Sequence, residues 1–163
     1  SFPTRRSSDL YNRREIVHRI NRALDVSAEN GSDVGLIMVD VDHFKKVNDE
    51  FGHDVGDYVL QEVAKVLKRS ADPAKGEAAG RWGGEEFFVV LPGRSVSETR
   101  EFAERLRLEI EGHSFEHMKK VTASFGVGCG NAASARKELF TRVDEALYRA
   151  KEGGRNRVNI WTT

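Results

Sequence analysis

Apolar residues recur along the chain with two periods, which predict helices and strands. Spacings of three or four residues place apolar side chains on one face of a helix. This pattern predicts helices over residues 11–30 and 43–50, from Asp54 through Val66, from Ser95 to Gly112, and from about Arg136 to Gly153. Asp54 and Ser95 are candidate N-caps, and Glu98 would complete a capping box with Ser95.

Apolar runs between these helices predict five strands: residues 34–39, a strand that ends near Trp82, residues 87–91, residues 121–127 and residues 158–161. The run Val34–Val39 contains no charged or polar side chain, so both of its faces should be buried. Helices and strands do not alternate strictly, which favours antiparallel strand pairs. We therefore expect an α/β fold of the α+β type, with a central, mainly antiparallel five-stranded sheet surrounded by helices.

The composition fits one domain with a sizeable core. The chain has 163 residues, and 26 basic residues balance 26 acidic ones, so net charge favours neither a nucleic acid nor a membrane as a partner. The single cysteine, Cys129, excludes an internal disulfide and a multi-thiolate zinc site. No apolar run has membrane-spanning length and no signal-peptide pattern is present, so we expect a cytoplasmic location.

Residues 1–9 differ from the rest of the chain. They show neither helical nor strand periodicity, and they back-translate to a widely used sequencing-adapter oligonucleotide. We therefore interpret residues 1–9 as a non-native, adapter-derived tail and residues 10–163 as the domain. A native disordered tail is the alternative. On the first interpretation, the chain is a piece of a longer protein.

The segment Arg81–Phe87, with the sequence RWGGEEF, carries the most specific signal. Gly83 and Gly84 permit a tight turn and the close approach of a ligand, and Glu85 and Glu86 follow directly. Carboxylates at the tip of a hairpin suit a hard cation such as Mg²⁺, which prefers oxygen ligands. The simpler alternative is an ordinary polar hairpin loop.

A second acidic group, Asp40 and Asp42, lies where the first predicted strand meets the helix that begins at His43. Free N–H groups at a helix N-terminus bind phosphate oxygens, and a carboxylate at the strand end would hold a cation that bridges the same phosphates. One hairpin return would bring this strand beside the glycine turn, so that Asp40 and Glu85 could share Mg²⁺. Alternatively, the two aspartates only favour the start of the helix.

Two further pairs of residues suit a nucleotide. Asn48 and Asp57 match a guanine edge, because a carboxylate accepts from the ring N–H and the amine while an amide reaches N3 or O6. Lys151 and Arg155, on either side of two glycines, would clamp the β- and γ-phosphates, and the Arg155 fork suits bidentate contact. The alternatives are a helix C-cap and a first-turn acid for the first pair, and simple helix-dipole cations for the second.

Together these segments resemble the GGDEF family, the catalytic domains of bacterial diguanylate cyclases. The similarity runs in order from Leu10 to about Ile160. The segments that carry it are Leu10–Arg14, Asp40–Asp49, Gly52-His53, Gly56-Asp57, Gly83–Phe87, Thr122–Val127, Asp144–Lys151 and Gly154–Asn156.

The resemblance implies that two GTP molecules condense into cyclic di-GMP with release of two pyrophosphates, on a fold similar to nucleotidyl cyclases and polymerase palms. It implies two divalent cations, Mg²⁺ or Mn²⁺, per active half-site, held by Asp40, the Val41 carbonyl and Glu85. The implied catalytic residues are Asp40, Glu85 and Glu86. The implied substrate-binding residues are His43, Phe44, Lys45, Asn48, Asp57, Gly83, Gly84, Lys151 and Arg155.

The resemblance also implies partners. One domain would hold one GTP, so turnover would need a homodimer, and an upstream sensor domain would be missing from this chain. The family often carries an Arg-x-x-Asp motif, which binds product and inhibits the enzyme. Ala74 and Glu77 stand at those positions, so we expect no strong product inhibition through that site.

Three alternatives to a diguanylate cyclase can be distinguished by experiment. The main one is a catalytically silent domain that binds GTP or cyclic di-GMP as a regulatory module. The second is a cyclase that makes another cyclic nucleotide, which the guanine-matching pair Asn48 and Asp57 disfavours. A nucleic-acid polymerase palm shares the two-metal chemistry, but the sequence shows no basic groove.

Overall fold

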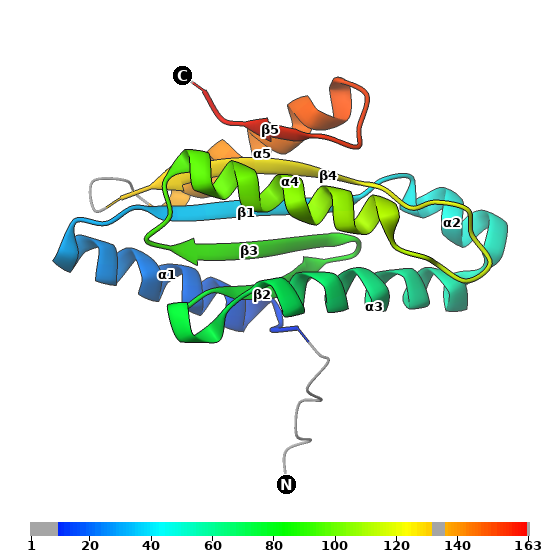
Figure 1. The fold of residues 1–163 in the computed structure, drawn as a ribbon, viewed down its shortest axis with the longest axis horizontal. Coiled ribbons are helices and arrows are strands. Elements are labelled where there is room, and N and C mark those ends of the chain that lie inside the picture. The colour runs from blue at the N-terminus through cyan, green and yellow to red at the C-terminus, as the bar shows by residue number, and fades with distance from the viewer. Residues whose placement is uncertain (1–9, 132–135, 163) are drawn as a thin grey trace, which may run out of the picture.

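A computed structural model describes residues 10–131 and 136–162, and it contains one five-stranded sheet covered by helices (Figure 1). The helices are α1 Arg13–Asn30, α2 Phe44–Phe51, α3 His53–Ser70, α4 Val96–Gly112 and α5 Arg136–Glu152, with a 3₁₀ turn, η1, at Pro73–Lys75. The strands are β1 Val34–Val41, β2 Ala78–Gly83, β3 Glu86–Pro92, β4 Ala123–Gly130 and β5 Val158–Ile160. Residues 1–9, which we interpret as a tail, lie outside the described residues.

The strand order is β2-β3-β1-β4-β5, with β1 at the centre. β1 runs antiparallel to β3 and β4, and β2 runs antiparallel to β3, whereas β5 runs parallel to β4. The expected α+β fold with a mainly antiparallel five-stranded sheet is therefore confirmed. β1 is buried along its whole length, as its uninterrupted apolar run predicted.

Two layers of helices sandwich the sheet. Successive side chains of a strand point to opposite faces. Ile37 and Val39 of β1 therefore belong to a core with α3 and α4, whereas Leu36 and Met38 belong to a second core with α1 and α5. Figure 1 shows α3 and α4 together on one side of the sheet, with α2 beyond the end of β1. The same alternation directs Asp40 toward α5.

Local expectations at helix starts are borne out in one case and wrong in another. Ser95 and Glu98 form the predicted capping box at α4. Asp54 does not cap α3, because the helix already begins at His53 with Gly52 as its N-cap and no side-chain cap. Asp54 is instead an acid of the first turn, where its negative charge interacts favourably with the helix dipole. Among the described residues, no helix combines the length and the apolar character that crossing a membrane requires.

Candidate active site at the end of the central strands

The hairpin between β2 and β3 places two glutamates at the end of the sheet. Gly83 pairs with Glu86, so Gly84 and Glu85 form a two-residue turn. Gly84 has a φ of 52°, which a residue without a Cβ adopts at little cost and which type II′ turns require at their first central position. Arg81 donates from Nε and Nη2 to the Gly84 carbonyl at 3.0 and 2.7 Å and thereby holds the turn in place.

Asp40 lies beside this turn. It is the register partner of Glu86 across β1 and β3, and the Val41 N–H donates to the Glu85 carbonyl at 3.2 Å. Because register partners on adjacent strands share a face, Asp40 and Glu86 both face α5. The fold thus brings together two acidic segments that are far apart in sequence, through the hairpin return that the sequence predicted.

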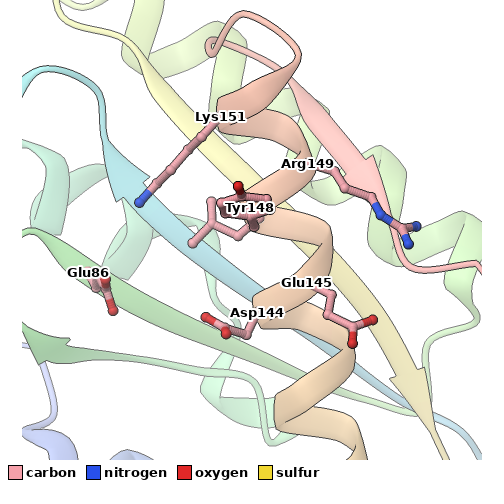
Figure 2. Close-up of a pocket in the computed structure, with 7 residues that line it drawn as sticks. Glu86, Asp144, Glu145, Tyr148, Arg149 and Lys151 are labelled. Atoms are coloured by element: carbon pink, nitrogen blue, oxygen red, sulfur yellow. The ribbon is translucent and has the colours of Figure 1, made fainter.

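Lys151 reaches Asp40 from the last turn of α5. Its Nζ lies 2.5 Å from Asp40 Oδ2, and Figure 2 shows the side chain extending from the helix toward β1. Asp40 is 5% exposed, whereas the Lys151 side chain is 32% exposed. The residue that the sequence suggested as a phosphate-binding cation therefore contacts the carboxylate that it suggested as a metal ligand.

The carboxylates at this end of the sheet are electrostatically unfavourable to one another. Burial raises the pKa of the Asp40 carboxyl above its usual value, and the hydrogen bond and charge of Lys151 offset only part of that rise. Burial also raises the pKa of Glu86, and the charge of Asp40 adds to the effect. Extra positive charge at this position would therefore be stabilising.

The donor atoms suit a hard divalent cation. Asp40 and Glu85 would supply carboxylate oxygens, and Val41 would supply a carbonyl oxygen, which are ligands that Mg²⁺ and Mn²⁺ prefer. Among the described residues there is no group of three or more His, Cys, Asp or Glu side chains that could hold a metal ion. A smaller set of ligands is usual for Mg²⁺, which binds one or two carboxylates and completes its shell with water and substrate phosphates. The residues present fit the cation.

The N-terminus of α2 supplies backbone donors next to this cluster. His43 precedes the helix in the left-handed region with a φ of 55°, and no side chain caps the helix. The first N–H groups of a helix have no partner within it, so those of Phe44 and Lys45 are placed to donate to an anion. A positive φ is uncommon for a residue with a Cβ, and here it turns the chain from β1 into α2.

Asn48 and Asp57 lie at the same junction between α2 and α3. A Cβ added at Gly56 would lie 1.9 Å from Asn48 Oδ1, so this glycine permits the close approach of the Asn48 side chain. Asp57 follows Gly56 on α3 and is exposed. The Asn48 carbonyl also accepts from the Gly52 N–H at 2.9 Å, as in a helix end. The end-of-helix interpretation and the guanine interpretation of Asn48 are therefore compatible, since one uses the backbone and the other the side chain.

Arg155 lies in the loop between α5 and β5. Its φ is 63°, and its backbone N–H donates to the Ala150 carbonyl at 3.0 Å. The side chain is exposed, and within residues 10–131 and 136–162 the guanidinium has no hydrogen-bond or ion-pair partner. Its five donors are therefore available to an anion.

A comparison with protein families decides the identity of this domain. The sequence model of the family described as "Diguanylate cyclase, GGDEF domain" matches residues 6–157. This chain belongs to the GGDEF family. The family suggested by the sequence motifs is therefore confirmed.

Relatives and solved structures agree with the assignment. The chain is 39% identical to the diguanylate cyclase DgcM of Escherichia coli K12 over 91% of its own length, and it spans about a third (36%) of that relative. The GGDEF domain of DgcB from Caulobacter crescentus, solved in complex with c-di-GMP, superposes with a TM-score of 0.90 at 32% identity and covers 100% of this chain and 98% of that one. The active GGEEF domain of a diguanylate cyclase from Vibrio cholerae gives a TM-score of 0.88 at 33% identity, over 95% and 99% of the two chains.

A pocket of about 410 Å³ opens between the hairpin and α5 of this GGDEF domain (Figure 2). Its lining residues are Glu86 from β3 and, from α5, Asp144, Glu145, Leu147, Tyr148, Arg149 and Lys151. Sequence reasoning used Asp144 and Tyr148 only as part of a motif and gave them no place in the site. Their spacing of seven and three residues from Lys151 was the signal that all three share one face of a helix.

The positions where the family often carries its product-binding motif are different here. Ala74 lies in η1, and the Glu77 side chain is 1% exposed. The Glu77 carboxylate accepts from Arg94 Nε at 2.9 Å and from the Asp72 N–H at 3.0 Å. Both contacts are internal, so Glu77 acts as a buried structural acid.

Proposed function

We propose that this domain condenses two GTP molecules into cyclic di-GMP and releases two pyrophosphates. The observation that carries the proposal is the position of Asp40, next to Glu85 and Glu86 and in contact with Lys151. Support also comes from the relatives, several of which are named diguanylate cyclases. The five residues Gly83–Phe87 spell GGEEF, the same five letters after which the active domain from Vibrio cholerae is named.

The proposed roles follow from chemistry and position. Asp40, the Val41 carbonyl and Glu85 would hold two Mg²⁺ or Mn²⁺ ions per half-site, with Glu86 beside them. When bound, these ions would acidify the attacking 3′-hydroxyl and neutralise charge on the phosphates. The α2 N-terminus, from His43 to Lys45, would donate backbone N–H groups to phosphate oxygens.

The remaining roles concern binding and orientation. Asn48 and Asp57 would pair with the guanine edge, and a base without that edge would leave these polar groups without partners in the complex. Lys151 would exchange its contact with Asp40 for the triphosphate when cations occupy the carboxylates, and Arg155 would contact the phosphate tail. Gly83 and Gly84 would let the nucleotide approach the hairpin backbone. Positioning and electrostatics then account for most of the rate.

Turnover by this mechanism requires two copies of the domain. The 3′-hydroxyl of one GTP attacks the α-phosphate of the other, and each domain offers one Asp40–Glu85 site. We therefore propose a homodimer in which two such sites face each other. We also propose a cytoplasmic setting, where GTP is available, and an upstream sensor that controls dimer formation.

The test separates a cyclase from a silent binding domain. The domain is incubated with GTP and Mg²⁺, and the products are separated by chromatography. Cyclic di-GMP that forms with a rate rising faster than linearly in protein concentration supports the proposal, because two copies must meet. Binding of GTP without any cyclic product would contradict the proposal and would support the regulatory alternative. Cyclic GMP as the product would contradict the condensation of two GTP molecules, and equally fast condensation of ATP in a parallel incubation would overturn the assignment of Asn48 and Asp57.

A further inference from the structure

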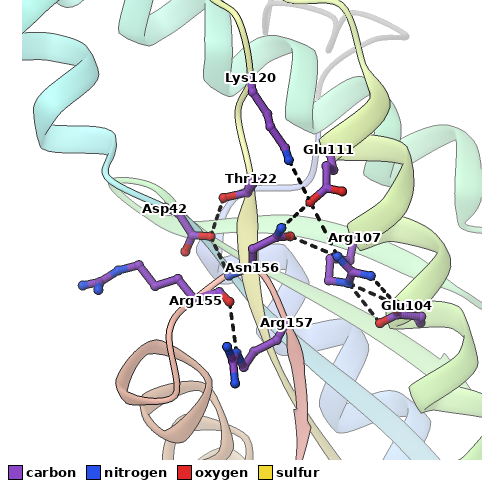
Figure 3. Close-up of polar contacts among 9 residues, drawn as sticks. All are labelled: Asp42, Glu104, Arg107, Glu111, Lys120, Thr122, Arg155, Asn156 and Arg157. Carbon is purple, nitrogen blue, oxygen red and sulfur yellow. Dashed lines mark hydrogen bonds and ion pairs between the residues drawn. The ribbon is translucent and has the colours of Figure 1, made fainter.

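A polar network with a buried centre ties the end of β1 to the loop that carries Arg155 (Figure 3). At its centre is Asp42, which is 7% exposed. Asp42 Oδ1 accepts from Ser124 Oγ at 2.6 Å, and Oδ2 accepts from Thr122 Oγ1 at 2.8 Å and from the Asn156 backbone N–H at 3.0 Å. Three protein donors thus use most of the acceptor capacity of this carboxylate, which leaves little for a cation.

The loop held by Asp42 has a backbone that its residues would rarely adopt alone. Gly154, Arg155 and Asn156 have consecutive positive φ values of 117°, 63° and 45°. Two of these residues carry a Cβ, and asparagine is one of the few such residues that tolerates this region. Persistence of such a conformation requires contacts that over-determine it. The Asp42 contact to the Asn156 N–H is one of them.

A second set of contacts holds the same loop from α4. Arg107 Nη1 donates to Asn156 Oδ1 at 3.1 Å, and Asn156 Nδ2 donates to Glu111. Glu104 fixes Arg107 in turn, with 2.5 Å between Glu104 Oε1 and Arg107 Nη2. Lys120 Nζ lies 3.5 Å from Glu111 Oε2. Asn156 is therefore fixed on both sides, by Asp42 through its backbone and by α4 through its side chain.

This arrangement fixes the backbone at Arg155 and so determines where its side chain points. Figure 3 shows its side chain pointing away from the network, whereas the Asn156 side chain points into it. The Arg155 carbonyl accepts from Arg157 Nε at 3.1 Å, so the Arg155 backbone is held. The Arg155 guanidinium has no partner among the described residues. Asp42 also lies two residues after Asp40, just beyond the end of β1, which places the anchored loop next to the acidic cluster.

We propose that Asp42 is a positioning residue that fixes Arg155 for the phosphate tail of the nucleotide. The inference rests on the proposed function, since it takes the nucleotide to bind beside Asp40. Asp42 therefore has a different task from Asp40, although it lies only two residues further along the chain, just after β1. Asn156 is the residue through which Asp42 acts.

The test measures binding of 3′-deoxy-GTP, which lacks the attacking hydroxyl and cannot be condensed, and of GMP, which lacks the phosphate tail. We expect Asp42→Asn to weaken 3′-deoxy-GTP binding about tenfold, because a neutral amide is a weaker acceptor for the Asn156 N–H than a carboxylate and cannot accept from three donors. GMP binding should change less than about twofold. Thr122→Val is the matched control: it removes one donor to the same carboxylate without touching the loop, and we expect binding of both nucleotides within about twofold of the wild type.

A double-mutant cycle with Arg155→Ala identifies the route of the effect. If Asp42 acts through Arg155, Asp42→Asn weakens 3′-deoxy-GTP binding by less than about twofold in the Arg155→Ala background. Equal effects in both backgrounds, or an equal loss of GMP binding, would overturn the inference. Where Asp42→Asn does not fold, Asp42→Ser carries the same cycle, because a short side chain with a single oxygen cannot accept from all three donors.

These outcomes are distinguishable from failure of the proposed function. A wild-type domain that binds 3′-deoxy-GTP but forms no cyclic di-GMP from GTP would contradict the cyclase activity, while the binding cycle would still decide the role of Asp42. A wild-type domain that binds neither nucleotide would overturn both proposals.

Discussion

Replacement of Lys151 by methionine should destabilise the domain in a manner that depends on pH. The substitution keeps an unbranched side chain but removes the ammonium that lies 2.5 Å from Asp40 Oδ2. Asp40 is 5% exposed, so its carboxylate would be left buried without a cation. Loss of one partner of a buried ion pair costs about 3–5 kcal/mol, and because Lys151 is itself one-third exposed we expect about 2–3 kcal/mol at pH 8.

The sign of the pH dependence follows from Asp40. Its pKa in the folded state is already raised by burial, and Lys151 opposes that rise, so the substitution raises the pKa further. A raised folded pKa means that the contribution of the group to stability is fully present below the unfolded pKa and is lost as pH rises through the folded pKa. The defect of Lys151→Met should therefore be small near pH 4 and should grow as pH rises toward 8.

Urea unfolding followed by circular dichroism measures the effect. With a slope of about 2 kcal/mol/M, a loss of about 2–3 kcal/mol lowers the midpoint by about 1–1.5 M at pH 8. The control is Asp40→Asn combined with Lys151→Met, which removes the buried charge and should restore most of the stability. A defect of equal size at pH 5 and pH 8, or one that persists in the double variant, would refute the reasoning.

Three further predictions follow from other parts of the structure. Gly56→Ala places a Cβ 1.9 Å from Asn48 Oδ1 and must displace that side chain, so we expect a higher KM for GTP and weaker discrimination against ATP, measured by competition kinetics. Glu77→Gln removes the charge that holds Arg94 at 2.9 Å and should cost about 1–3 kcal/mol of stability in urea unfolding. Because Glu77 is paired with Arg94, cyclic di-GMP added to the assay should inhibit turnover only weakly. Strong inhibition at a cyclic di-GMP concentration similar to that of the protein would contradict this view.

The parts of the fold that could be predicted from the sequence are those that local periodicity determines. The apolar run Val34–Val39 predicted a strand buried on both faces, and β1 is that strand. The capping box at Ser95 depends on residues three positions apart and was equally visible. The cap expected at Asp54 was wrong because the observed N-cap, Gly52, lies two residues earlier, and a glycine gives little local indication of which conformation it will adopt.

The candidate site was predicted in composition but not in contacts. The motifs indicated Asp40, Glu85 and Lys151, whereas the ion pair between Lys151 and Asp40 depends on which face of the sheet α5 covers, and that is a property of tertiary packing. The sequence grouped Asp42 with Asp40 where the strand meets the helix and gave it no separate role, and the structure shows a buried acceptor that binds residues from β4 and the α5–β5 loop. Nothing local distinguishes the two aspartates, because their partners lie far away in sequence.

The measurement that tests the central claim most directly is the rate of cyclic di-GMP formation from GTP as Mg²⁺ is titrated, for the wild-type domain and for Glu85→Gln. Glu101→Gln, an exposed position on α4, is the matched control for loss of one acidic side chain. If Asp40 and Glu85 hold the catalytic ions, Glu85→Gln should lower the rate by at least about a hundredfold, and Glu101→Gln should leave it unchanged. A rate equal to that of the wild type in Glu85→Gln, or no cyclic di-GMP from the wild-type domain at any Mg²⁺ concentration, would contradict the central claim.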